Sequence, residues 1–138
     1  MKGAHILTTQ ENISFSKEIV KHLPLAIRKR LPKEIAVIAV SPQESLKLNR
    51  RYRGKRAPTN VLSFLYGPEY GEIIICPAII RREAKEQRSA QAFQMTWMIV
   101  HGMLHLAGLH HEKSARMAKR VERIEQGVLA VFLEKRKK

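Results

Sequence analysis

Three histidines near the C-terminal end of the chain constrain its fold more than any other feature. They are His101, His105 and His111, and the stretch that spans them reads HGMLHLAGLHH. Residues four apart lie on one face of a helix, with Cβ atoms about 6 Å apart, so the first two imidazoles can face a common point. Gly108 lacks a Cβ and can end the helix in a left-handed turn, which returns the chain toward that point. The spacing therefore predicts a helix, a turn and a cluster of imidazoles.

Such a cluster favours a catalytic metal site. Three neutral nitrogens and one open position are typical of catalytic zinc, whereas structural zinc normally has four protein ligands. The spacing His-x3-His-x2-Gly-x2-His is known from a large class of zinc hydrolases and selects His111 as the third ligand, with His110 as the alternative. Buried core histidines are the competing interpretation, but imidazoles bury poorly unless both nitrogens are satisfied. We expect one Zn²⁺ per chain, bound by His101, His105 and His111.

The residue after the first histidine argues against a peptidase. Zinc peptidases of this spacing place a glutamate there as general base, whereas this chain has Gly102. The metal is therefore expected to act on another substrate.

The charge balance indicates what that substrate is. The chain has 138 residues, which is enough for one domain, and 26 Lys and Arg against 12 acidic residues give a net charge of +14. Such an excess predicts a polyanionic partner, most simply nucleic acid or a ribonucleoprotein surface. A generically basic protein is the alternative.

Other features bear on location. The sequence has no apolar run of membrane-spanning length, and its first residues lack the apolar segment of a signal peptide. The single cysteine, Cys76, excludes an internal disulfide and suits a reducing compartment. We expect a cytoplasmic protein with no membrane partner, in which Cys76 is a small buried hydrophobe.

The order of elements predicts a single α+β domain over residues 1–138, with a small mixed β-sheet of about four strands flanked by helices. The strands are predicted at residues 5–9, 34–40, 60–66 and 72–76. The helices are predicted from residue 14 or 16 to about 30 with a break at Pro24, and at 42–52, 77–88, 91–107 and 112–134. Residues 135–138 form a basic tail that we expect to fray.

A second segment carries possible chemistry. Residues 50–56 hold five cations around Gly54 and lead into the strand sequence through Thr59, Asn60 and Ser63. Guanidinium groups bind phosphate bidentately, and a glycine lets the backbone approach it closely. An ordinary solvated turn, with polar side chains that only satisfy backbone groups, explains the same pattern. Composition alone leaves both interpretations open.

The histidine stretch, together with YRGK at residues 52–55 and PTNVLSF at residues 58–64, resembles the YbeY family of bacterial metal-dependent endoribonucleases. That family is also known as ribosomal RNA maturation factors. The segment GEIIIC at residues 71–76 is similar to a glycine-acid-aliphatic strand of the family. The resemblance covers residues from about 34 to 129 and implies a small mixed sheet with flanking helices.

The resemblance also implies roles. His101, His105 and His111 would bind zinc, and Arg53 matches a functionally important arginine beside the metal, so these four residues are the expected catalytic set. The implied activity is single-strand-specific RNA cleavage in ribosomal RNA processing, especially at the 3′ end of small-subunit RNA, and in ribosome quality control. The implied partners are ribosomal RNA, small-subunit ribosomal proteins and assembly factors.

Further RNA contacts are expected from exposed cations on either side of the histidines. The candidates are Arg51, Lys55, Arg56, Arg116 and Arg120. A solvated helix face is the other interpretation of the last two. Tyr52, Phe64 and Tyr66 are possible platforms for stacked bases.

Three positions depart from the family pattern. His110 and Glu72 each stand where aspartate is usual, and Leu65 replaces a frequent proline. A carboxylate before the third ligand could orient it, so His110 puts metal affinity or metal choice in question. Two other functions remain open, a zinc peptidase-like hydrolase and a non-catalytic ribosome assembly factor that contains zinc.

Overall fold

The structure, a computed structural model, describes residues 16–136. The strands are β1 (Glu34–Ala39), β2 (Val61–Leu65) and β3 (Tyr70–Ile75). After a helical segment at residues 16–21, the helices are α2 (Leu25–Arg28), α3 (Pro42–Arg53), α4 (Pro77–Glu86), α5 (Gln91–Leu106) and α6 (Ala115–Arg136). A single 3₁₀ turn, η1 (His111–Lys113), lies between α5 and α6.

The sheet is mixed, as predicted. Its order is β1-β3-β2, with β1 parallel and β2 antiparallel to the central β3. β3 buries Ile73, Ile74 and Ile75 in succession, so both of its faces are covered, which is typical of a central strand. Three of the about four predicted strands lie within residues 16–136, and all three are present. The remaining one, at residues 5–9, lies outside the described range.

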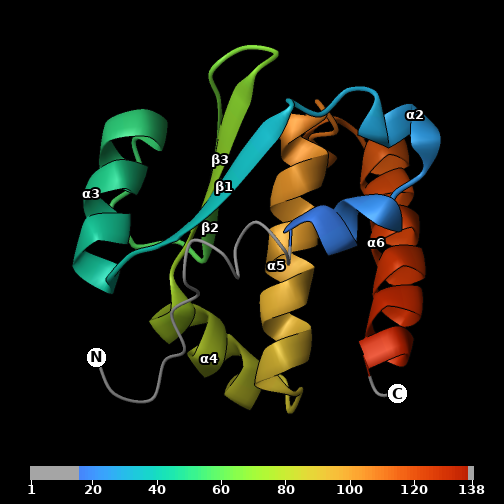
Figure 1. The fold of residues 1–138 in the computed structure, drawn as a ribbon. Helices are drawn as coiled ribbons and strands as arrows, with labels where there is room; N and C mark the ends of the chain where they lie inside the picture. The colour runs from blue at the N-terminus through green and yellow to red at the C-terminus, as the bar shows by residue number, and fades with distance from the viewer. Residues whose placement is uncertain (1–15, 137–138) are drawn as a thin grey trace.

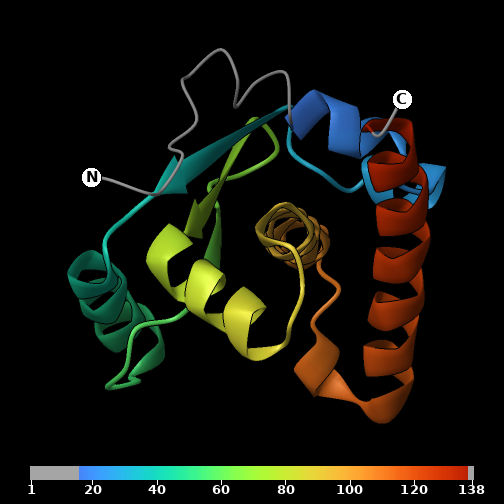
Figure 2. The ribbon, with the colours of Figure 1, turned by 90° about the horizontal axis from the view of Figure 1, so that it is seen from below.

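The helices cover the sheet in layers. α5 lies between the sheet and α6, whereas α3 lies at the opposite side of the molecule (Figures 1 and 2). α5 packs against β2, β3, α4 and α6. It buries Ile99, Val100, Met103 and Leu104 completely, as expected of a helix that is apolar on most of its circumference. The predicted histidine helix is therefore the central helix of the fold.

Local sequence explains where the helices begin. Ser41 caps α3 in a capping box with Glu44, and Pro42 occupies the first turn, as predicted. The first predicted helix divides at Pro24, so that residues 16–21 and α2 are separate.

The last helix corrects two predictions. α6 begins at Ala115 rather than at Glu112, because the Ser114 hydroxyl accepts a hydrogen bond from the Met117 backbone N–H at 3.0 Å and acts as the cap. α6 also continues to Arg136, so half of the tail that we expected to fray is helical.

Two other expectations concern the environment of the chain. Cys76 is buried, with 1% of its surface exposed, as predicted. Within residues 16–136, no helix combines the length and apolarity that a membrane span requires.

Candidate metal centre

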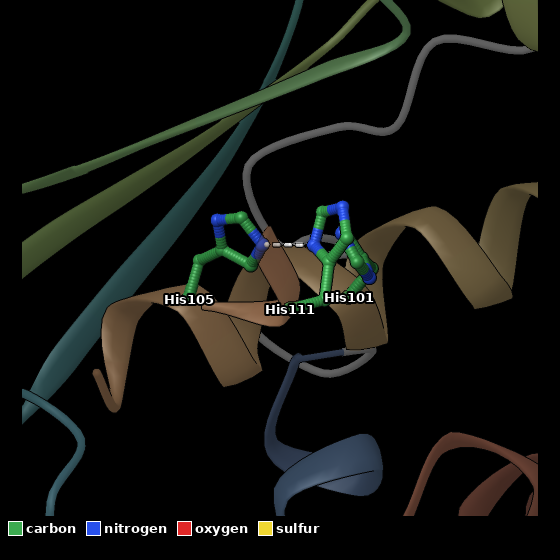
Figure 3. A group of neighbouring side chains, drawn as sticks. All are labelled: His101, His105 and His111. Atoms are coloured by element: carbon green, nitrogen blue, oxygen red, sulfur yellow. Dashed lines mark hydrogen bonds between the residues drawn. The ribbon is translucent and has the colours of Figure 1, made fainter. Parts of the chain in front are cut away.

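The structure brings the three predicted histidines together. His101 and His105 project from α5, and His111 opens η1. One ring nitrogen from each residue lies within 4.8 Å of the others, and Figure 3 shows the rings gathered at one point. His105 Nε2 and His111 Nδ1 are 3.3 Å apart. Nitrogens that bind zinc tetrahedrally at 2.0–2.1 Å stand about 3.3 Å from each other. The donor set and its spacing therefore fit a divalent metal ion such as zinc.

The turn after α5 positions the third histidine. Gly108 has a left-handed backbone with φ 89°, and its N–H donates to the His105 carbonyl at 2.9 Å. The Leu109 N–H donates to the Leu104 carbonyl at 2.9 Å, and Leu109 is fully buried. These two bonds and the buried leucine form a Schellman motif, which ends the helix and reverses the chain. The prediction that Gly108 ends this helix in a left-handed turn is confirmed.

His110 lies beside this cluster. Its ring is 4.9 Å from the His105 ring, but its nitrogens are outside the group that His101, His105 and His111 form. Its Nδ1 is instead 3.8 Å from a carboxylate oxygen of Glu112. The geometry thus favours His111 over His110 as the third ligand.

The environment keeps the central imidazole neutral. Burial, and after it the charges of the neighbouring His101, His110 and His111, lower the pKa of His105 to about 4, against an opposing effect of Glu112. A neutral imidazole is the form that binds a metal. His105 is therefore ready to act as a ligand near pH 7.

A buried glutamate completes the surroundings, and sequence reasoning missed it. Glu125 of α6 is 5% exposed, and its Oε2 lies 2.5 Å from His101 Nδ1. Its Oε1 accepts a hydrogen bond from Trp97 Nε1 at 2.9 Å. The signal was available, because Glu125 shares the spacing of the buried residues Val121 and Val128 on α6.

Packing against the sheet explains the glycine at position 102, which the comparison with zinc peptidases did not suggest. A Cβ at this position would lie 2.7 Å from Cγ2 of Ile73 in β3. The Gly102 carbonyl also accepts a hydrogen bond from the Ser63 hydroxyl of β2 at 3.0 Å. Position 102 therefore faces the sheet rather than the histidine cluster, and a glutamate has no room there.

The basic segment after α3 is held in a fixed shape. Buried Ser45 accepts from the Thr59 N–H at 2.8 Å and donates to the Thr59 carbonyl at 2.7 Å. Buried Asn49 donates to the Ala57 carbonyl at 2.7 Å, and Asn60 donates to Glu83 of α4 at 2.9 Å. Polar residues of this segment thus satisfy structural hydrogen bonds, and the cations between them stay exposed.

Arg53 is the last residue of α3, and its side chain is exposed. Within residues 16–136, the hydrogen bonds and ion pairs of the three histidines do not include Arg53. The loop after α3 and η1 nevertheless lie along the same edge of the molecule, the lower one in Figure 2. The other candidate contacts are also exposed: Arg51, Lys55, Arg56, Arg116 and Arg120. The last two belong to the part of α6 that follows η1.

The predicted stacking residues already have aromatic partners. Tyr52 meets Phe64 edge-on at 5.0 Å between ring centroids, and the Arg51 guanidinium lies 5.5 Å from the Tyr52 centroid. Tyr66 stacks on Tyr70 at 5.8 Å. Tyr52 and Tyr66 are both more than half exposed, so their free faces remain open to solvent.

Fold and site together define a class: small α+β proteins in which a central helix and the turn after it bring together three histidines that can hold one metal ion. Residues 2–132 match the family model described as Endoribonuclease YbeY, and the chain belongs to this family.

Known relatives agree with this assignment. An endoribonuclease YbeY of Alkalilimnicola ehrlichii is 40% identical over 108 residues, which cover 72% of this chain and 64% of the relative. One from Thermotoga neapolitana is 39% identical over 75% of this chain and 73% of its own length. One from Stenotrophomonas maltophilia is 36% identical over 86% and 78%.

A solved structure is similar to the fold. The solution structure of a Thermotoga maritima protein aligns with a TM-score of 0.58 at 26% identity, over 88% of this chain and 83% of that one.

Proposed function

We propose that this chain is a zinc-dependent, single-strand-specific endoribonuclease that acts in ribosomal RNA processing, including 3′-end maturation of small-subunit RNA, and in ribosome quality control. The observation that carries the proposal is the convergence of three imidazoles, with ligand nitrogens within 4.8 Å, in a chain of the YbeY family. The relatives are named endoribonucleases, which supports RNA as the substrate. Cytoplasmic location, small-subunit ribosomal proteins and assembly factors as partners follow from the same proposal.

The residues of the chain have distinct tasks. His101, His105 and His111 would hold the ion, and three protein ligands are one fewer than the four of a structural zinc site. A zinc ion bound in this way supplies Lewis acidity and activates water near neutral pH. Arg53 binds the phosphoryl oxygens and neutralises the charge that develops on them during cleavage.

The exposed cations hold the RNA backbone. Arg51, Lys55 and Arg56 flank Arg53 on the segment that Ser45 and Asn49 fix. Arg116 and Arg120 extend the basic surface from the other side of η1. Such contacts are sequence-independent, which suits an enzyme that recognises single strands rather than a base sequence.

The peptidase-like alternative is not favoured. Its general base would have to stand at position 102, where even a Cβ would lie 2.7 Å from Ile73 Cγ2. The comparison of RNA binding with RNA cleavage, described next, distinguishes a non-catalytic zinc protein from an endoribonuclease.

The test compares metal-loaded protein, chelator-treated protein and the Arg53→Ala and His101→Ala variants on single-stranded RNA, duplex RNA and casein. We expect cleavage of single-stranded RNA that requires both metal and Arg53. The His101→Ala protein, purified in parallel, controls for contaminating nuclease. Cleavage that persists in this variant, or turnover of casein alone, refutes the proposal. RNA binding without turnover assigns the chain to the non-catalytic class.

The ends of the products identify the nucleophile. Direct attack by water leaves a 3′ end without a cyclic phosphate, whereas attack by the neighbouring ribose hydroxyl leaves a 2′,3′-cyclic phosphate. Mass spectrometry of the fragments distinguishes the two routes.

A further inference from the structure

Glu125 is a carboxylate in the interior of the protein. It is 5% exposed and lies between Val121 and Val128 on the face of α6 that enters the core. A buried carboxylate is unfavourable unless hydrogen bonds or charges compensate for its lost hydration. Both of its oxygens have partners here, one on His101 and the other on Trp97.

The chemistry of these partners determines which ring nitrogen of His101 carries a proton. A carboxylate only accepts hydrogen bonds, and the indole N–H of Trp97 only donates. The contact between His101 Nδ1 and Glu125 Oε2 is therefore a donated Nδ1–H. The proton of a neutral imidazole is then on Nδ1, and Nε2 keeps its lone pair for the cluster with His105 and His111.

We propose that Glu125 is a positioning residue of the metal centre. It holds His101 in the Nδ1–H tautomer with Nε2 directed to the ion, and Trp97 fixes the carboxylate from its other oxygen. The inference deepens the proposed function and rests on it, because it presupposes metal binding by His101. Partners of this kind orient metal-binding histidines, and their removal weakens metal affinity by about 10- to 100-fold.

A substitution that keeps the shape of the side chain tests the proposal. In Glu125→Gln, one of the two accepting oxygens becomes an NH2 group, which only donates, so either His101 or Trp97 loses its acceptor. Zinc affinity, measured by competition with a chromophoric chelator at constant pH, should fall by about 10- to 100-fold. Glu122→Gln is the matched control, because Glu122 is exposed on the same helix, and it should bind zinc like the unmodified protein. Equal affinities of Glu125→Gln and the unmodified protein would overturn the proposal.

A second measurement needs no substitution. Nitrogen-15 NMR of the histidine side chains in the metal-free protein should show His101 protonated at Nδ1. A proton on Nε2 instead would overturn the proposal, even if Glu125→Gln fails to fold. Different results would refute the two hypotheses. If the unmodified protein binds no zinc, the proposed metal centre itself is refuted. An unmodified protein that binds one ion, with unchanged affinity in Glu125→Gln, refutes only the role of Glu125.

Discussion

At the scale of single residues, one carboxylate determines the acidity of two tyrosines. Tyr66 and Tyr70 donate their hydroxyls to the two oxygens of Glu72, at 3.1 and 2.8 Å. The hydrogen bond to Glu72, followed by burial and the charge of the carboxylate, raises the pKa of Tyr70 to about 12. Burial and the same carboxylate also raise the pKa of Tyr66.

The first prediction concerns alkaline stability. The folded state holds the Tyr70 proton up to about pH 12, whereas the ordinary tyrosine pKa of 10.0 applies in the unfolded chain. The resulting stabilisation is complete below pH 10 and is lost as the pH rises from 10 toward 12. Glu72→Gln should therefore lower the pKa of Tyr70, measured by the ultraviolet absorbance of tyrosinate. The Tyr70→Phe variant shows which part of the titration curve belongs to Tyr70. An unchanged titration in Glu72→Gln contradicts the assignment.

The second prediction separates phosphate recognition from metal binding. Arg53→Ala should lower the rate of RNA cleavage by about 10²- to 10³-fold, the usual cost of removing a group that stabilises developing charge. The cleavage rate of Arg53→Lys should lie between those of Arg53→Ala and the unmodified protein, because lysine keeps the charge but lacks the bidentate guanidinium group. Zinc affinity should stay constant in both, since Arg53 lies outside the ligand group. Lys47→Ala, an exposed substitution on the same helix, is the control and should cleave normally. A loss of zinc binding in Arg53→Ala would assign this residue a structural role instead.

At the scale of elements, the approach of α5 to the sheet depends on a missing side chain. Ile73 and Ser63 pack against the backbone of Gly102, on the turn of α5 that also carries His101. The distance between helix and sheet, and with it the position of the ligands, is set by this contact.

The third prediction compares two helical glycines. Alanine is favoured over glycine within a helix by about 1 kcal/mol. At Gly127 in α6, a Cβ meets nothing within 4 Å, so Gly127→Ala should raise the free energy of unfolding by roughly 0.5–1 kcal/mol. At Gly102 the clash with Ile73 should reverse the sign, since overpacking costs about 1–3 kcal/mol. Urea unfolding measures both, and a stabilised Gly102→Ala would show that the sheet yields easily.

The elements also show what the sequence could predict. Ser41 with Pro42 identified the start of α3, and Gly108 identified the end of α5, because each acts through its own neighbours in the chain. Local pattern was insufficient where partners are distant. The spacing of Glu125 with Val121 and Val128 could indicate that it is buried, but not that its partner is His101, which is 24 residues away. Gly102 suggested only a missing catalytic base, because its neighbour Ile73 comes from another element.

At the scale of the whole molecule, the net charge of +14 is the dominant property. Six exposed cations are proposed to contact RNA phosphates: Arg51, Arg53, Lys55, Arg56, Arg116 and Arg120. They belong to two segments far apart in the sequence, the end of α3 with its following loop and the beginning of α6. A polyanion that contacts both segments would release counterions from its entire bound length.

The fourth prediction is the salt dependence of RNA binding. For single strands, the logarithm of affinity falls with the logarithm of salt concentration with a slope of about −0.7 per neutralised phosphate. If these six cations each neutralise one phosphate, the affinity should fall by about two and a half decades between 50 and 200 mM salt. The His101→Ala protein allows this measurement by fluorescence anisotropy without cleavage of the RNA. Replacing Arg116 and Arg120 together by alanine should reduce the slope by about 1.4. An unchanged slope in that variant would place the RNA on the α3 side alone, and affinity independent of salt would contradict recognition through the backbone.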